Sequence, residues 1–320
     1  MGRKSSVRGG LRAKSMRWLG IAAAALTVAA SIVLAPSVEP AVAISGSDFN
    51  PGLIISDSEF YNGQAMSQSD IQAFLDARIG SCQNGRCLNV LTQDTYSRPQ
   101  DRTVCSAYTG EANESVARMI YKVQAACGIS AKVLLVTLQK EMGLVTSKAP
   151  SQWALNHAMG YACPDTAPCD SDKAGFYNQV YSAAWQFKRY STPTPWGSYQ
   201  PGWKSIGFNP NASCGSSSVY IQNNATAALY NYTPYQPNAA ALANLGGLGD
   251  GCSSYGNRNF WVFYTNWFKS SGTVAIDHAY QQAGGEAGPL GAVVSSGYCS
   301  TSASVCSSDY TNGSIYWSWN

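Results

Sequence analysis

The clearest pattern of apolar and polar positions in the chain is a helical one over residues 128–145. Ser130 can cap this helix, because its hydroxyl accepts a hydrogen bond from the first free backbone N–H groups. At 3.6 residues per turn, Leu138 and Glu141 share one face, and the other faces are apolar as well. We therefore expect a central, buried helix that carries one carboxylate near its end.

Similar patterns predict the elements on either side. The sequence Ser67-Gln68-Ser69-Asp70 resembles a capping box before a short helix. A second helix is expected over 111–127, with Glu111 and Glu114 in its first turn, where acidic side chains suit the helix dipole. Further helices are expected over 174–190, 224–232 and 238–245, a strand over 219–221, and a helix or a strand over 259–268. We expect long loops over 80–109 and 146–174.

The N-terminal residues have the pattern of a secretory signal peptide. Residues 1–17 carry six basic residues and no acidic one, residues 18–35 are apolar, and Ala41-Val42-Ala43 offers a cleavage site. We expect cleavage after residue 43, and an uncleaved membrane anchor is the alternative. No other apolar run is long enough to span a bilayer.

Removal of this segment changes the charge of the chain. The formal net charge of +3 becomes −2, since 15 basic and 17 acidic residues remain. The basic character is therefore a targeting feature, and it gives no support for binding of nucleic acid.

The ten cysteines all follow the signal segment, and an even number in a secreted chain indicates disulfides. Sequence spacing suggests three small loops and two longer links, one connectivity among many: Cys82–Cys87, Cys163–Cys169, Cys299–Cys306, Cys105–Cys127 and Cys214–Cys252. Zinc is the rival interpretation. It is disfavoured because no C-x-x-C pair exists and because His157 and His278 lie far from any cysteine cluster in the sequence. We predict no metal and no cofactor.

Composition divides the remaining chain in two. Residues 44–270 are poor in charge and rich in Tyr, Trp, Gly, Asn and Ser, which is typical of secreted proteins that handle carbohydrate. Residues 269–273 are expected to form a polar linker. The Gly- and Ser-rich residues 274–320 are expected to form a small second domain.

Glu141 is the candidate for chemistry. A carboxyl beside apolar walls has a raised pKa, as a general acid requires. The alternative is an ordinary residue at a helix end, solvated and paired with Lys140 or Lys148.

The helix, its glutamate and the following loop resemble the lysozyme-like domain of lytic transglycosylases and goose-type lysozymes. The resemblance rests on the helix from Leu134 to Leu144 and on the loop Met159-Gly160-Tyr161, in which the glutamine of that family is absent. It implies a mainly α, lysozyme-like fold with disulfide-pinned loops. It also implies Glu141 as the catalytic acid, Gly160 and Tyr161 as cleft residues, and a tyrosine near the acid, either Tyr232 or Tyr235.

The activity that the resemblance implies is cleavage of the β-1,4 bond between N-acetylmuramic acid and N-acetylglucosamine in peptidoglycan. A lytic transglycosylase needs one carboxylate, whereas ordinary glycosidases need two. The only other acids in the matching loop are Asp165, Asp170 and Asp172. The exposed candidates for sugar stacking are Tyr161, Trp196 and Trp203, while Tyr177, Tyr181 and Trp185, at helical spacing, are expected in the core.

The tail resembles an LGFP repeat, on the basis of Gly288-Pro289-Leu290-Gly291 and of residues 310–318. The resemblance implies a small β or irregular repeat module that attaches the chain to the cell envelope. Only one copy is present, and Ala292-Val293 departs from the motif.

The sequence is therefore compatible with two alternative functions. One is a secreted, wall-associated enzyme that cleaves peptidoglycan glycan strands. The other is a non-catalytic wall-binding protein or adhesin with the same fold. Neither involves nucleic acid, and a membrane enters only through an uncleaved signal segment. An open groove with aromatic walls at Glu141 would favour the enzyme, whereas a carboxylate paired with lysine would favour the binding protein.

Overall fold

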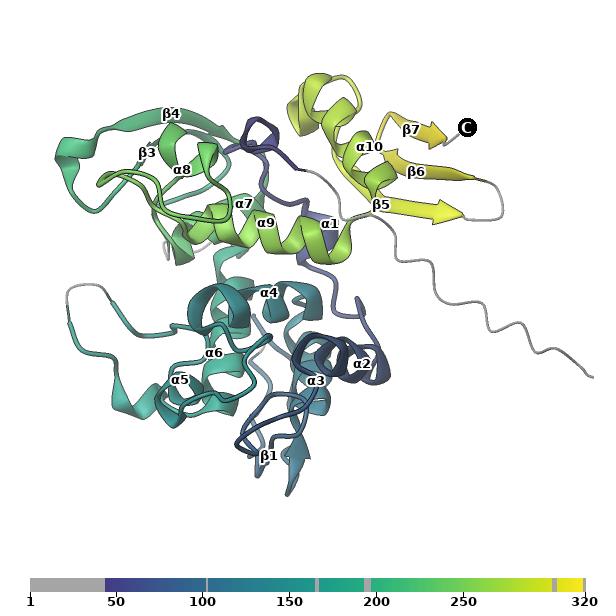
Figure 1. The fold of residues 1–320 in the computed structure, drawn as a ribbon. Coiled ribbons are helices and arrows are strands. Elements are labelled where there is room, and N and C mark those ends of the chain that lie inside the picture. Colours follow the sequence, from purple (N-terminus) through teal and green to yellow (C-terminus); the bar gives the residue numbers. More distant parts are fainter. Residues whose placement is uncertain (1–43, 102, 165–166, 193–196, 301–303, 319–320) are drawn as a thin grey trace, which may run out of the picture. The chain divides into compact units, whose positions relative to one another are not determined.

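The computed structural model describes residues 44–101, 103–164, 167–192, 197–300 and 304–318, all of which fall in one compact unit. The predicted signal peptide, together with Trp196 and Asp165, lies outside the described residues. Figure 1 shows the chain as a ribbon.

The elements of the described residues run as follows. The α-helices are α1 (Asp57–Phe60), α2 (Gln68–Ile79), α3 (Val116–Cys127), α4 (Ala131–Met142), α5 (Gln152–Asn156), α6 (Phe176–Tyr190), α7 (Asn224–Tyr232), α8 (Ala239–Ala243), α9 (Gly256–Phe268) and α10 (Ser271–Gln282). The strands are β1 (Thr92–Gln93), β2 (Glu114–Ser115), β3 (Gly202–Gly207), β4 (Ser216–Ile221), β5 (Val293–Ser300), β6 (Val305–Tyr310) and β7 (Gly313–Ser318). Short 3-10 helices lie at Gly46–Asp48, Ser171–Lys173, Ala212–Cys214 and Gly285–Ala287.

The strands pair in three small antiparallel sheets, β1-β2, β3-β4 and β5-β6-β7. The prediction of a mainly helical chain is therefore confirmed only in part, because helices and small sheets occur together. The finer assignment to a lysozyme-like fold stays a prediction.

The central helix is confirmed. In α4 the Ser130 hydroxyl accepts a hydrogen bond from the Lys132 N–H, and Gly143, with a φ of 64°, ends the helix in the left-handed conformation. Every residue from Val133 to Leu138 is buried. The helix packs against α9 (Figure 1). Its buried side chains belong to the largest apolar cluster of the described residues.

Other helix predictions are confirmed at α2, α6, α7 and α8, the strand prediction is confirmed at β4, and residues 259–268 are helical in α9. The capping box at Ser67 is present, with Asp70 as its partner. The expected loop over 146–174 holds the short helix α5, because Ser151 caps it.

The predicted start of the second helix is wrong. Residues 111–115 precede α3, which begins at Val116 and is capped by Ser115. Glu114 belongs to β2 and is buried, and its carboxylate lies 2.5 Å from the Lys122 Nζ and 2.6 Å from the Tyr108 hydroxyl. Glu111 forms two hydrogen bonds with Arg118 instead of meeting the helix dipole.

All five predicted disulfides are present, and the described residues hold no free cysteine. They are Cys82–Cys87, Cys105–Cys127, Cys163–Cys169, Cys214–Cys252 and Cys299–Cys306. Cys299–Cys306 joins paired residues of β5 and β6, Cys105–Cys127 ties a loop to α3, and the other three link residues outside the α-helices and strands.

Residues 269–273 are not a linker. Ser270 and Thr273 form a capping box that starts α10, and this helix packs on the sheet β5-β6-β7. Ile276 and Tyr280 of α10 form a small apolar cluster with Cys306 and Tyr310 of the sheet. Residues 269–273 are polar because Ser270 and Thr273 form this cap. The division into domains at residues 270 and 274 stays a prediction.

Among the described helices, none has by itself the length and apolarity to cross a bilayer. Only α3 and α4 together, bent by 120° at their break, reach that length and composition.

Candidate functional site

The carboxylate of Glu141 lies near the C-terminal end of α4, where the buried helix reaches the surface. Its side chain is 24% exposed. This placement agrees with the sequence prediction, because the preceding turns of α4 are buried and only the last turn is accessible.

Glu141 is paired with the lysine that precedes it. Nζ of Lys140 bonds to Oε1 of Glu141, donates to the Thr233 hydroxyl at 3.1 Å and lies 5.6 Å from the centre of the Tyr232 ring. The Lys140 side chain is 3% exposed, so the pair is shielded on the lysine side. Pairing with Lys140 was the alternative stated for Glu141.

The second carboxylate oxygen faces the loop after α5. A methyl group built on Gly160 would lie 3.0 Å from Oε2 of Glu141, and Gly160 has a φ of 65°. Glycine is therefore favoured here twice, by its backbone conformation and by the close approach to the carboxylate. Gly160, which the resemblance implies as a cleft residue, thus lies directly beside the Glu141 carboxylate.

One buried side chain holds this loop in place. Oε1 of Gln179, on α6, accepts hydrogen bonds from the backbone N–H groups of Met159 (3.2 Å) and Tyr161 (3.0 Å). Its Nε2 donates to the carbonyl oxygens of Tyr161 (3.0 Å) and Lys173 (2.8 Å). Gln179 is 1% exposed. Sequence reasoning missed it, although a polar residue inside an apolar helical pattern is a signal for such a role.

Tyr232, rather than Tyr235, lies beside Glu141. Its hydroxyl donates to the carbonyl oxygen of Met159 at 2.7 Å, so the tyrosine also fastens the loop. Burial, with the nearby charge of Glu141, raises the pKa of Tyr232 well above its usual value and keeps the phenol protonated. The backbone of Tyr235 instead pairs with Gly207 at the end of β3.

A groove with a volume of about 550 Å³ runs beside the loop. It is lined by Gly160, Tyr161, Ala162, Cys163, Pro164, Pro168, Asp170, Gln186, Tyr190 and Tyr232. The lining therefore combines three tyrosines with the polar side chains of Asp170 and Gln186 and with Cys163 of the disulfide Cys163–Cys169. Oδ1 of Asp170 accepts the N–H of Asp172 at 2.9 Å, which is the turn chemistry expected of an aspartate in this position.

The aromatic predictions divide between core and surface. Tyr177 and Tyr181 are buried, as expected, and Nε1 of the partly buried Trp185 donates to Asp101. Trp203 is 70% exposed on β3, opposite Tyr220 of β4, and does not line the groove. Trp196 lies outside the described residues.

His157 is closer to cysteines than its sequence position indicated. A ring nitrogen of His157 lies within 4.8 Å of the sulfurs of Cys163 and Cys169. These two cysteines form a disulfide and offer no thiolate to a metal. The ring lies against Trp153 with the two ring centroids 4.7 Å apart and the ring planes tilted by 35°.

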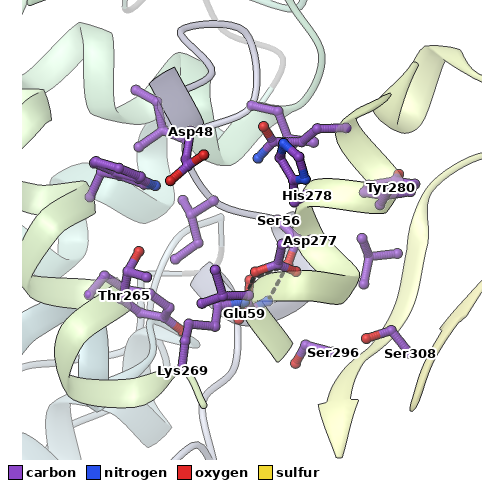
Figure 2. Close-up of a pocket in the computed structure, with 18 of the residues that line it drawn as sticks. Asp48, Ser56, Glu59, Thr265, Lys269, Asp277, His278, Tyr280, Ser296 and Ser308 are labelled. Atoms are coloured by element: carbon purple, nitrogen blue, oxygen red, sulfur yellow. Dashed lines mark hydrogen bonds and ion pairs between the residues drawn. The ribbon is translucent and has the colours of Figure 1, made fainter. Parts of the chain in front are cut away.

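A second cavity, of about 70 Å³, was not predicted (Figure 2). It lies where residues 44–59 meet α9, α10 and the strands β5 and β6. Nζ of Lys269 lies 2.5 Å from Glu59 Oε1 and 3.0 Å from Asp277 Oδ2. Burial opposes the charge of Lys269, yet the two carboxylates hold its pKa above the usual value. These contacts join α1 to α10, which is a structural role.

Comparison with family models matches residues 53–271 to the model described as LasA, N-terminal domain. This range includes Glu141, the loop, Gln179, Tyr232 and Lys269, and it ends at the start of α10. Neither the curated proteins nor the solved structures give a match.

Proposed function

The chain belongs to the family of LasA N-terminal domains, and for this member we propose a secreted, wall-associated protein that binds peptidoglycan glycan strands in the groove and cleaves them with Glu141. The observation that carries the proposal is the position of Oε2 of Glu141 against Gly160, a residue that also lines the groove. The tyrosine walls suit sugar rings, since an aromatic ring offers an apolar face and a polar edge.

In this proposal the protonated carboxyl donates to the glycosidic oxygen as the bond to the anomeric carbon breaks. The carboxylate then takes a proton from the muramoyl 6-hydroxyl, which closes a 1,6-anhydro ring, or from water. Oε2 performs both transfers, because Oε1 is bonded to Lys140. Tyr232 and Gln179 do not take part in proton transfer. They hold the loop that sets the distance between the carboxyl and the glycan.

The pair between Lys140 and Glu141 supports a second candidate. A carboxylate bonded to a shielded ammonium must break or rearrange that bond before it can donate a proton. If this does not happen, the groove retains glycan without turnover, and the chain is a wall-binding protein.

The test is digestion of purified peptidoglycan by the secreted chain, with products identified by mass spectrometry. We expect anhydromuropeptides from the wild type and a loss of about 10²- to 10⁴-fold in Glu141→Gln, as for removal of a general acid. Reducing ends in place of anhydro ends would identify a hydrolase. No release from either protein, with both still sedimenting with the wall, would leave the second candidate.

Lys140→Met separates the candidates further. The catalytic proposal predicts that this variant still releases product, with a changed pH profile, because the carboxyl loses its partner. The wall-binding candidate predicts no release at any pH.

A further inference from the structure

The C-terminal sheet has one face covered and one face open. On the covered face α10 packs against the strands (Figure 1). The approach is so close that a methyl group on Gly272 would lie 2.4 Å from the Cys306 Sγ. On the other face stand Tyr298 and Tyr316, which are 72% and 70% exposed. Single exposed apolar residues are ordinary, whereas a contiguous exposed patch marks a site of interaction, so the relative position of the two rings decides their meaning.

The register aligns these two tyrosines. Tyr298 of β5 pairs with Ser307 of β6, which pairs with Tyr316 of β7. Residues directly opposite in an antiparallel sheet point to the same face, so both rings flank one serine. Two strand spacings separate them, about 10 Å at the backbone.

A polar row lies beside the aromatic one. Ser295, Asp309 and Ser314 are aligned in the same way, and both serine hydroxyls donate to the Asp309 carboxylate, at 3.0 and 2.7 Å. An irregularity in β5 between Ser295 and Tyr298 keeps both residues on the open face, although three positions separate them. Each serine oxygen retains lone pairs that can accept from a ligand hydroxyl.

The charge of this face selects among partners. Asp309 is the only charged residue in the described parts of the three strands. A surface without cations and with one carboxylate disfavours nucleic acids, anionic lipids and phosphate-bearing wall polymers. Two flat rings beside a row of hydroxyl groups suit an uncharged or weakly charged polyhydroxyl chain. In an extended β-1,4-linked glycan, alternate pyranose rings present the same face, and their separation is similar to that of the two tyrosines.

We propose that this open face, formed by Tyr298, Ser307, Tyr316, Ser295, Asp309 and Ser314, is a second glycan-binding site. It retains the chain on the wall and takes no part in bond cleavage. Tyr298 and Tyr316 stack on alternate sugar rings, and the Ser295-Asp309-Ser314 row binds their hydroxyl groups. The inference rests on the proposed function only for the choice of polymer, since it needs no turnover at Glu141.

The test is sedimentation with purified peptidoglycan from which the anionic polymers have been removed. It uses the full secreted chain carrying Glu141→Gln, so that the wall stays intact. We expect Tyr298→Ala with Tyr316→Ala to weaken binding about ten-fold or more, as for loss of two aromatic anchors. Tyr298→Phe with Tyr316→Phe should retain binding. Tyr121→Ala, which removes an exposed tyrosine on α3, is the matched control and should bind unchanged.

Unfolding curves of all variants show whether the sheet is intact. Unchanged sedimentation of the double alanine variant would overturn the proposal. So would binding that needs the anionic polymers and disappears at high salt. Product release is measured separately with Glu141 in place. Sedimentation that depends on the two tyrosines, without product release, would refute cleavage by Glu141 and support this binding site. Product release with sedimentation that does not depend on the tyrosines would support cleavage by Glu141 and refute this binding site.

Discussion

Replacement of Gln179 by methionine tests whether one amide organises the loop at Glu141. Methionine has a similar length and no hydrogen-bonding amide, so four hydrogen bonds are lost while most of the volume is kept. The Met159 N–H is then buried without a partner, which costs about 1–3 kcal/mol. The other three groups are partly accessible, and each loses a bond worth about 0.5–1 kcal/mol, because water can replace it. Together these losses lower the free energy of unfolding by about 2.5–6 kcal/mol.

The assay is urea unfolding, combined with hydrogen exchange at the amides of Met159 and Tyr161. Both amides should exchange faster in Gln179→Met, while the amides in the middle of α4 keep the same ranking of exchange rates among themselves. Gln72→Met is the matched control, because the Gln72 amide donates at the half-exposed surface of α2 and its loss should cost under about 1 kcal/mol. If Gln179→Met is as stable as Gln72→Met and the two amides exchange at the wild-type rate, the loop does not depend on Gln179 and the reasoning is wrong.

Three further changes test other parts of the structure. Gly160→Ala should destabilise by about 1–2 kcal/mol from its positive φ and more from its contact with Glu141. This variant is compared by thermal unfolding with Gly143→Ala, because Gly143 has a φ of 64° and open space around it and so measures the backbone cost alone. Equal losses of stability in Gly160→Ala and Gly143→Ala would disprove the effect of the contact with Glu141. Lys269→Met leaves Glu59 without its cation and should lower the free energy of unfolding, measured with urea, by about 3–5 kcal/mol. The double variant Lys269→Met with Glu59→Gln should recover part of this loss, and no recovery would contradict the pairing. Hydrogen bonds from Arg118 lower the pKa of Glu111 to about 2 from the usual 4.5, so stability present above pH 4.5 should fall as the pH approaches 2. The free energy of unfolding should depend less steeply on pH in Glu111→Gln than in the wild type. Identical dependence on pH in the two proteins would refute the lowered pKa of Glu111.

The features that the sequence predicted are local ones. Ser130 and the apolar run after it define the start and the body of α4, because the residues that form this pattern are close together in the sequence. The end of the helix at Gly143 was not predicted, since the apolar pattern continues to Val145. Three of the disulfides follow from short spacings for the same reason, and Cys105–Cys127 and Cys214–Cys252 are a pairing of the four cysteines that remain. Residues 259–268 are dense in aromatic residues, and such a segment fits a buried helix and a buried strand equally well until its neighbours are known.

The features that the sequence did not predict depend on residues far apart in the chain. Gln179 looks like an ordinary polar residue of a helix until the loop of Met159 lies beside it. Glu114 looks like a favourable first-turn acid, yet the pairing of β1 with β2 places it in a buried position beside Lys122. At Glu141 the adjacent lysine was visible in the sequence, whereas its shielding between Thr233 and Tyr232 was not.

The way in which residues 51–55 are fastened also has a consequence for the order of folding. The N–H of Ile54 donates to Thr226, Tyr230 donates to the carbonyl of Pro51, and Asn223 donates to the carbonyl of Ile55, across 172, 179 and 168 positions. Such distant contacts cannot form until α7 has been synthesised, and closing so long a loop slows the search for the native state. Residues 51–55 therefore leave the ribosome early but reach their native contacts only after α7 has been synthesised.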